Sequence, residues 1–182
     1  MTRRYVILDR DGVLNRESSA FIKNADEWQP LPGAMEALGL LSRAGFTIAV
    51  ATNQSGIARG LFDRAALQAM HRKLRRLAAQ HGAKIDRIVY CPHGPDDGCN
   101  CRKPLPALLL RLARRYQISL DDVPAVGDSL RDLDAAVAAG AKPVLVLTGN
   151  GSRTAAELAK CGRSVETYDD LLAFARSVTA RQ

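Results

Sequence analysis

Hydrophobic positions along the chain follow two alternating patterns, which predict a regular succession of strands and helices. Short apolar runs without strict polar alternation are typical of strands that are buried on both faces. Longer stretches with apolar residues three and four positions apart are typical of amphipathic helices. We expect strands at 5–8, 47–51, 88–90, 124–126 and 144–148, and helices that begin near Gly33, Asp63, Pro104, Leu130, Thr154 and Asp169.

This order of elements predicts an α/β fold, in which a doubly wound, Rossmann-like parallel sheet is covered by helices on both faces. The sequence contains no internal repeat, low-complexity tract or linker, so we expect residues 1–182 to form a single domain. The connections that follow Gly12 and Tyr90 are too short to hold a lid domain. We therefore expect an open, capless cleft.

Composition narrows the class of protein. Of the 182 residues, 47% are hydrophobic and 25% are charged, which excludes a disordered or fibrous chain. No apolar run approaches the roughly 20 residues of a membrane helix, and the apolar stretch at 5–8 is too short for a signal peptide. We expect a cytoplasmic protein without a membrane partner, whose four cysteines are metal ligands or thiols rather than disulfides.

The formal net charge of +7 suggests an anionic partner, either nucleic acid or a small molecule. The densest basic cluster contains Arg72, Arg75 and Arg76, which share one face of a predicted amphipathic helix. No aromatic residues lie between them, as a groove for single-stranded nucleic acid would need. We interpret the cluster as a solvated helix face, expect no nucleic-acid partner, and consider the charge suited to a phosphorylated small molecule.

The residues that follow the strands carry the strongest functional signal, because ligands of such sheets bind beyond the carboxyl ends of the strands. Asp9 and Asp11 follow the first strand, Thr52 the second and Asp128 the fourth, while Lys103 lies in the loop after the third. Paired carboxylates suit nucleophilic attack on phosphorus and acid–base catalysis. Three carboxylates favour Mg²⁺, and the Thr52 hydroxyl and Lys103 ammonium suit phosphoryl oxygens.

These residues occur in a recognisable set of motifs. The set Asp9-x-Asp11-Gly12, Thr52, Lys103 and Gly127-Asp128-x-x-x-Asp132 resembles the haloacid dehalogenase superfamily of phosphohydrolases, over nearly the whole chain. Members of that superfamily that cleave carbon–halogen or carbon–phosphorus bonds lack an acid at the position of Asp11, so the resemblance favours hydrolysis of a phosphate ester.

The resemblance also implies a role for each motif residue. Asp9 would be the nucleophile and a magnesium ligand. Asp11 would be the general acid/base and would bind the metal through its backbone carbonyl, and Asp128 would be the remaining protein ligand. Thr52 and Lys103 would bind the phosphoryl group. Asp132 would stabilise these residues without itself binding the metal.

A second metal site is predicted in the loop after the third strand. Cys91-x-His93 and Cys99-x-Cys101 provide three thiolates and one imidazole within eleven positions. Tetrahedral Zn²⁺ takes such a set, and four protein ligands leave no open position for catalysis. The alternative is a group of free cysteines beside a turn histidine. Cys161 lies far along the chain in a helical stretch, and we expect it to be buried by packing.

The zinc loop and the following Cys101-Arg102-Lys103-Pro104 resemble two groups within the superfamily. One group is the D-glycero-D-manno-heptose 1,7-bisphosphate 7-phosphatases, which serve ADP-heptose precursor synthesis for surface polysaccharide. The other is the histidinol-phosphate phosphatases. The stretches 9–15 and 52–60 match the heptose group. The zinc loop is short, as in the histidinol group, and Ser129 stands where both groups often carry a basic residue.

The heptose bisphosphate phosphatase is the preferred prediction, and histidinol-phosphate phosphatase is the alternative. The implied substrate contacts are Asp9, Arg10, Asp11, Ser18, Ser19, Ala20, Phe21, Thr52, Asn53, Gln54, Ser55, Arg59, Arg102, Lys103 and Ser129. We expect a monomer that binds a small sugar phosphate with Mg²⁺ for catalysis and Zn²⁺ for structure. A non-enzymatic zinc module that binds nucleic acid is the rival from another class, and the paired carboxylates argue against it.

Overall fold

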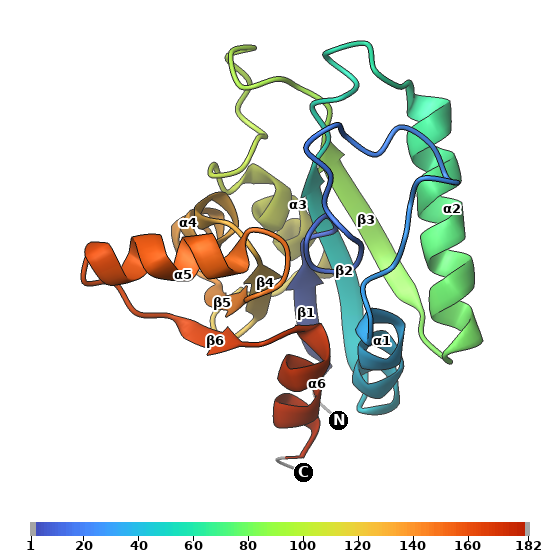
Figure 1. Ribbon diagram of the computed structural model, residues 1–182. Helices are drawn as coiled ribbons and strands as arrows, with labels where there is room; N and C mark the ends of the chain where they lie inside the picture. Colours follow the sequence, from blue (N-terminus) through green and yellow to red (C-terminus); the bar gives the residue numbers. More distant parts are fainter. Residues whose placement is uncertain (1–2, 181–182) are drawn as a thin grey trace.

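The computed structural model describes residues 3–180, which form a central sheet between two layers of helices (Figure 1). The strands are β1 (Arg4–Leu8), β2 (Phe46–Asn53), β3 (Ile85–Cys91), β4 (Pro124–Gly127), β5 (Lys142–Val146) and β6 (Glu166–Tyr168). The helices are α1 (Ala34–Arg43), α2 (Arg64–Gln80), α3 (Ala107–Tyr116), α4 (Leu130–Ala138), α5 (Gly151–Lys160) and α6 (Leu171–Thr179).

The sheet is parallel throughout and has the strand order β3-β2-β1-β4-β5-β6. The chain therefore reverses direction across the sheet between β1 and β4, and this is the topological switch point at which ligands of doubly wound sheets bind. The predicted fold class is confirmed. Within residues 3–180, the loops after β1 and β3 carry no inserted domain, so the cleft is capless as expected.

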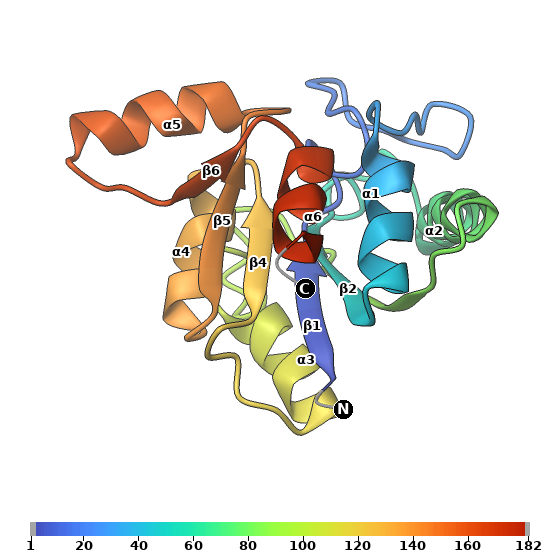
Figure 2. The same ribbon diagram turned by 90° about the horizontal axis from the view of Figure 1, so that it is seen from below.

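Alternate residues of each strand pack against different helix layers, which explains the nearly continuous apolar runs. Val6 and Leu8 contribute to the core under α1, α2 and α6, whereas Ile7 between them packs toward α3 and α4. Figure 2 shows these two layers on opposite sides of the sheet. A third, smaller cluster joins Leu145 of β5 to α4 and α5. The sheet is thus held rigidly on both faces below its carboxyl edge.

The structure differs from the sequence prediction at the carboxyl-terminal part of the chain. Strand β6 was not predicted, because Glu-Thr-Tyr contains no buried apolar residue; it pairs with β5 as a short edge strand. Helix α5 begins at Gly151, three residues before the predicted start at Thr154, which is already buried inside the helix. No helix in the described part of the chain combines the length and the apolar character that crossing a membrane requires.

The prediction that Cys161 is buried is wrong. Helix α5 buries Thr154 and Leu158 on one face, and Cys161 would continue that face if the helix were longer. The helix ends at Lys160, however, and the chain turns at Cys161 and leads the thiol into solvent. A capping position is therefore exposed although its spacing matches the buried stripe.

Candidate active site and metal centres

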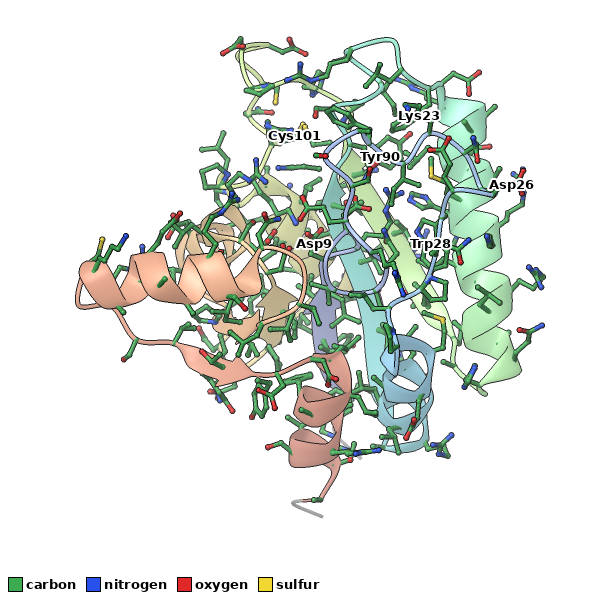
Figure 3. The ribbon with its side chains drawn as sticks, in the orientation of Figure 1. Asp9, Lys23, Asp26, Trp28, Tyr90 and Cys101 are labelled. Carbon is green, nitrogen blue, oxygen red and sulfur yellow. The ribbon has the colours of Figure 1, made fainter. Side chains whose placement is uncertain are left out.

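Three carboxylates converge at the switch point of the sheet. Asp9 follows the last residue of β1, Asp128 follows β4, and Asp132 lies in the first turn of α4. One oxygen from each lies within 4.8 Å of the others. Figure 3 shows Asp9 at the carboxyl end of β1, below the loops that surround the cleft. The sequence prediction that Asp9 and Asp128 come together is confirmed, and Asp132 joins them directly.

Lys103 is the cation inside this acidic cluster. Its Nζ lies 2.9 Å from Asp9 Oδ1 and 2.5 Å from Asp132 Oδ1, and it donates a hydrogen bond of 2.8 Å to the carbonyl of Ala51. Asn53 holds the backbone of Lys103 from both sides, through hydrogen bonds of 3.1 Å to its N–H and its carbonyl. Lys103 is only 4% exposed, so its charge acts in a low-dielectric environment.

The electrostatics of the cluster call for a further cation. Burial, and then repulsion by Asp132, raises the pKa of Asp9 to about 7, against the attraction of Lys103. Burial and the charges of Asp9 and Asp132 raise the pKa of Asp128 to about 8. Burial also opposes ionisation of Asp132, but Lys103 and hydrogen bonds from Ser129 outweigh it and lower the pKa of Asp132. A divalent ion would relieve the repulsion, and an all-oxygen donor set suits Mg²⁺.

Asp11 is held by a different set of partners, although it is only two residues from Asp9. Arg10 donates to both of its carboxylate oxygens, at 2.9 Å and 3.0 Å from Nη2. Asn15 donates to Oδ1 at 2.9 Å and Gln54 to Oδ2 at 2.8 Å. Burial alone would raise the pKa of Asp11, but the charge of Arg10 and these hydrogen bonds hold it below its usual value. Asp11 is therefore an ionised, fixed carboxylate beside the cluster.

A cavity of about 330 Å³ opens above these residues. Of the expected substrate contacts, every residue except Ala20 lines this cavity; Ala20 is exposed on the flap after β1. Thr52 is buried at its floor and accepts a hydrogen bond of 2.9 Å from Gln54. Arg10 and Gln54 border the cavity as well, but their side chains are buried and donate hydrogen bonds to Asp11.

Several lining residues were not found by sequence reasoning. They are Ile22, Gly56, Phe62, Pro95 and Arg131. Arg131 is the most informative of these. The related enzymes often carry a basic residue at the position of Ser129, and Arg131 provides a basic side chain two residues later. A signal for Arg131 did exist, since it lies in the first turn of a helix that directly follows Asp128.

Arginines surround one part of the cavity. Arg59, Arg102 and Arg131 all line it, and within residues 3–180 none of them forms an ion pair. Burial and the neighbouring Arg131 lower the pKa of Arg102. The guanidinium of Arg59 lies 5.7 Å from the centre of the Phe21 ring, and Arg102 donates to the carbonyl of His93 at 3.2 Å. Uncompensated positive charge of this kind favours an anionic ligand.

One acidic residue, Glu17, faces the same cavity from the flap. Partial burial, and then repulsion by Asp11, raises its pKa. Asn150, at the start of α5, donates a hydrogen bond to Glu17 and others to Asp128 Oδ2, of which the one from its backbone N–H is 2.7 Å long. Asn150 thereby connects the flap to the acidic cluster.

The four predicted zinc ligands come together in the loop that follows β3. One ligand atom from each of Cys91, His93, Cys99 and Cys101 lies within 4.8 Å of the others. His93 Nδ1 is 3.5 Å from the Cys91 sulfur and 3.2 Å from the Cys101 sulfur, and no cysteine is in a disulfide. Three sulfurs and one imidazole nitrogen fit tetrahedral zinc with no open position. Figure 3 shows Cys101 in this loop, and Arg102 follows it in the sequence.

The chain is similar in sequence to known phosphatases. The model of a family described as haloacid dehalogenase-like hydrolase matches residues 4–140. D-glycero-beta-D-manno-heptose-1,7-bisphosphate 7-phosphatase of Pseudomonas putida is 54% identical over 175 residues, covering 96% of this chain and 99% of that protein. The protein of the same name from Bordetella bronchiseptica is 58% identical over 154 residues, or 85% and 86% of the two chains.

A solved structure is also similar along its whole length. The D,D-heptose 1,7-bisphosphate phosphatase from B. bronchiseptica, crystallised with magnesium and phosphate, superposes with a TM-score of 0.94 at 52% identity. The match covers 98% of this chain and 99% of that structure.

Proposed function

The chain belongs to the haloacid dehalogenase-like hydrolases, and from this premise we propose that it removes the 7-phosphate of D-glycero-D-manno-heptose 1,7-bisphosphate. The reaction is a Mg²⁺-dependent hydrolysis of a phosphate monoester, in the synthesis of ADP-heptose precursors. The observation that carries the proposal is the cleft itself. It combines a half-buried nucleophile, a fixed carboxylate and a buried lysine with three arginines that form no ion pair among the described residues. The chain is 52–58% identical to enzymes of that name.

The chemistry begins at Asp9. One carboxylate oxygen of Asp9 attacks the phosphorus, the bond from phosphorus to the sugar oxygen breaks, and its electron pair stays on that oxygen. The Asp11 carboxyl group gives its proton to the leaving oxygen. Water then attacks the aspartyl phosphate and returns a proton to Asp11, which frees the Asp9 carboxylate and inorganic phosphate. The arriving phosphoryl dianion favours the protonated form of Asp11, because like charges raise a pKa.

The remaining residues of the cluster prepare the phosphoryl group. We assign Lys103 and Thr52 to its oxygens, where a fixed charge and a hydroxyl stabilise the transition state. The carboxylates of Asp9 and Asp128, with the backbone carbonyl of Asp11, would hold Mg²⁺. When bound, that ion supplies positive charge to the carboxylates and to the phosphoryl oxygens. Zinc in the cysteine loop would be structural, because its four ligands leave no position for substrate.

The second phosphate of the substrate is the reason to prefer a bisphosphate. Arg59, Arg102 and Arg131 line the cavity and form no ion pair among residues 3–180, so a dianion between them would compensate their charge. The cavity of about 330 Å³ has room for a small sugar phosphate. A loop of cysteines without a disulfide suits a reducing compartment, which supports the cytoplasm as its location.

Histidinol phosphate remains the second candidate, because Glu17 could pair with its amine. A comparison of purified enzyme on both substrates decides between them. We expect kcat/KM to be at least tenfold higher for the heptose bisphosphate, equal to about 1.4 kcal/mol of transition-state binding. Equal or better turnover of histidinol phosphate, lost in a Glu17→Gln variant, would reverse the choice of substrate and leave the phosphatase chemistry intact.

A further inference from the structure

A closed set of buried hydrogen bonds lies directly beneath the general acid/base. It is made by Arg10 and Gln54, which bind each other and Asp11. We propose that Arg10 and Gln54 are positioning residues for Asp11, which they hold through these hydrogen bonds. The inference rests on the function proposed above, since it assigns the residues that hold the acid/base of that reaction.

The Arg10 side chain is committed to Asp11. Its Nε and Nη2 lie 3.1 Å and 2.9 Å from Asp11 Oδ1, and Nη2 lies 3.0 Å from Oδ2. Neighbouring residues of a strand point to opposite faces, but here the chain turns after β1. The carbonyl of Arg10 accepts the N–H groups of Leu14 and Asn15, at 2.8 Å and 3.2 Å. This turn allows two consecutive side chains to pair.

The Arg10 side chain is almost fully buried, although Arg10 borders the cavity. Arg10 is 1% exposed, and its remaining nitrogen, Nη1, is buried and has no hydrogen-bond partner among the described residues. The other two side-chain nitrogens, Nε and Nη2, are already committed to Asp11 and Gln54. A buried arginine needs a charged partner to offset its desolvation, and Asp11 is that partner. Contact with substrate through Nε or Nη2 would require this ion pair to break.

Gln54 completes the set from the other side of the cleft. Its Oε1 accepts from Arg10 Nη2 at 3.1 Å, and its Nε2 donates to Asp11 Oδ2 at 2.8 Å and to Thr52 Oγ1 at 2.9 Å. The backbone N–H of Gln54 is in turn held by the carbonyl of Cys91 at 2.7 Å. Gln54 thus links the acid/base to the hydroxyl that we assign to the phosphoryl group.

This arrangement fixes both oxygens of Asp11. A general acid must be within hydrogen-bond reach of the leaving oxygen, and a displacement of about 1 Å can cost roughly 100-fold in rate. If Arg10 and Gln54 hold Asp11 in that position, replacing them will lower the rate most for substrates whose leaving group needs a proton. A sugar alkoxide is a poor leaving group and needs the proton, whereas p-nitrophenolate leaves without one.

The experiment compares the phosphorylation step for these two leaving groups. Arg10→Lys keeps the charge but removes the forked contact, and Gln54→Met removes the amide at similar volume. Arg76→Lys is the matched control, at an exposed arginine of α2 that does not line the cavity. Single turnovers with enzyme in excess would follow the release of p-nitrophenol and of heptose monophosphate. Far-ultraviolet circular dichroism would establish folding.

We expect Arg10→Lys and Gln54→Met to slow the step at least tenfold more for the heptose bisphosphate than for p-nitrophenyl phosphate. Arg76→Lys should change the ratio of the two rates less than threefold, because Arg76 contacts neither Asp11 nor the cavity. If Arg10→Lys does not fold, Gln54→Met alone decides. Equal losses on both substrates, or none, would overturn the assignment. Failure of the natural enzyme to form a phosphoryl adduct on Asp9, detected by mass spectrometry after acid quench, would instead contradict the proposed function.

Discussion

Lys103 Nζ lies 2.5 Å from Asp132 Oδ1, which makes this ion pair shorter than the one between Lys103 and the nucleophile. The other oxygen of Asp132 accepts hydrogen bonds from the backbone and hydroxyl of Ser129, at 3.0 Å and 2.5 Å. Asp132 therefore connects the start of α4 to a lysine that follows the zinc loop. The two halves of the cleft are joined through one buried carboxylate.

The first prediction follows from this contact. Asp132→Asn should lower kcat/KM roughly 10–100-fold, as is typical when a partner behind a metal site is removed. Lys103 would then pair with Asp9 alone and compete with its reaction at phosphorus. Asp134→Asn is the control, since Asp134 lies in the same helix but pairs with Arg163 at the surface. Steady-state kinetics over a Mg²⁺ titration would test this, and equal behaviour of the two variants would contradict it.

The sequence was sufficient to predict the residues whose place depends on strand ends. Asp9, Thr52 and Asp128 each follow a buried apolar run, and parallel strands bring such positions to one edge. The four zinc ligands were found for a similar reason, because they lie within eleven positions of one loop. In both cases short-range spacing determines the neighbourhood.

Features that depend on side-chain direction or on distant segments could not be predicted. Arg10 follows the nucleophile directly in the sequence. Its guanidinium pairs with Asp11 only because the chain turns after β1, and the sequence pattern does not show this turn. Arg131 reaches the cavity because of the orientation of α4, and Asn150 meets Glu17 across 133 residues of sequence. Strand β6 gains its order from pairing with β5 rather than from its own composition.

The second prediction concerns the two acids. Asp9→Asn should abolish turnover, because an amide is a poor nucleophile and a weaker metal ligand. Asp11→Asn should slow both formation and hydrolysis of the phosphoenzyme by roughly 10²–10⁴, as for lost acid–base catalysis. Beryllium fluoride should bind at Asp9, which crystallography would show. Near-normal turnover by Asp9→Asn, purified free of other phosphatases, would exclude the covalent route.

The third prediction concerns Arg131 and the second phosphate. Arg131→Ala should raise KM for the heptose bisphosphate roughly tenfold, the effect of losing one charge-assisted hydrogen bond. It should leave KM for p-nitrophenyl phosphate unchanged, because that substrate has no second phosphate. Arg76→Ala, on the exposed face of α2, serves as the control. Equal increases in KM for both substrates would place Arg131 at the reacting phosphate instead.

The fourth prediction concerns pH and stability. Burial, and then the charges of Arg10 and Arg75, lowers the pKa of His71 from 6.5 to about 3. As pH falls below 6.5, the unfolded chain takes up a proton that the folded chain does not, so the free energy of unfolding decreases until pH approaches 3. The loss from this residue is about 2 kcal/mol by pH 5.

Urea unfolding at pH 7 and pH 5 would measure this contribution. His71→Gln should show a smaller decrease in the free energy of unfolding between the two pH values than the natural chain does. His81→Gln replaces an exposed residue just beyond the same helix. Its free energy of unfolding should decrease between the two pH values by as much as that of the natural chain. If the free energy of unfolding decreases equally in the natural chain and in both variants, burial does not lower the pKa of His71.

The fifth prediction separates structure from catalysis in the zinc loop. Cys101→Ser should lose zinc and raise KM, while the core stays folded. Cys91 is the last residue of β3 and is fully buried, so its replacement would disturb the core as well. Cys101 lies outside the sheet, and the remaining chain buries enough apolar surface to fold without the loop. Cys161→Ser, at the exposed end of α5, is the matched control.

Cys101→Ser should affect mainly KM, because Arg102 and Lys103, which follow the zinc loop, are held by different partners. Arg102 is held by the carbonyl of His93, which is itself a zinc ligand, whereas Asn53 holds Lys103 independently. Loss of zinc would therefore release Arg102 before Lys103, and added Mg²⁺ would not restore the loop. Metal analysis, circular dichroism and kinetics would test these points together. A natural enzyme without stoichiometric zinc, or a Cys101→Ser enzyme with unchanged KM, would contradict a structural zinc site.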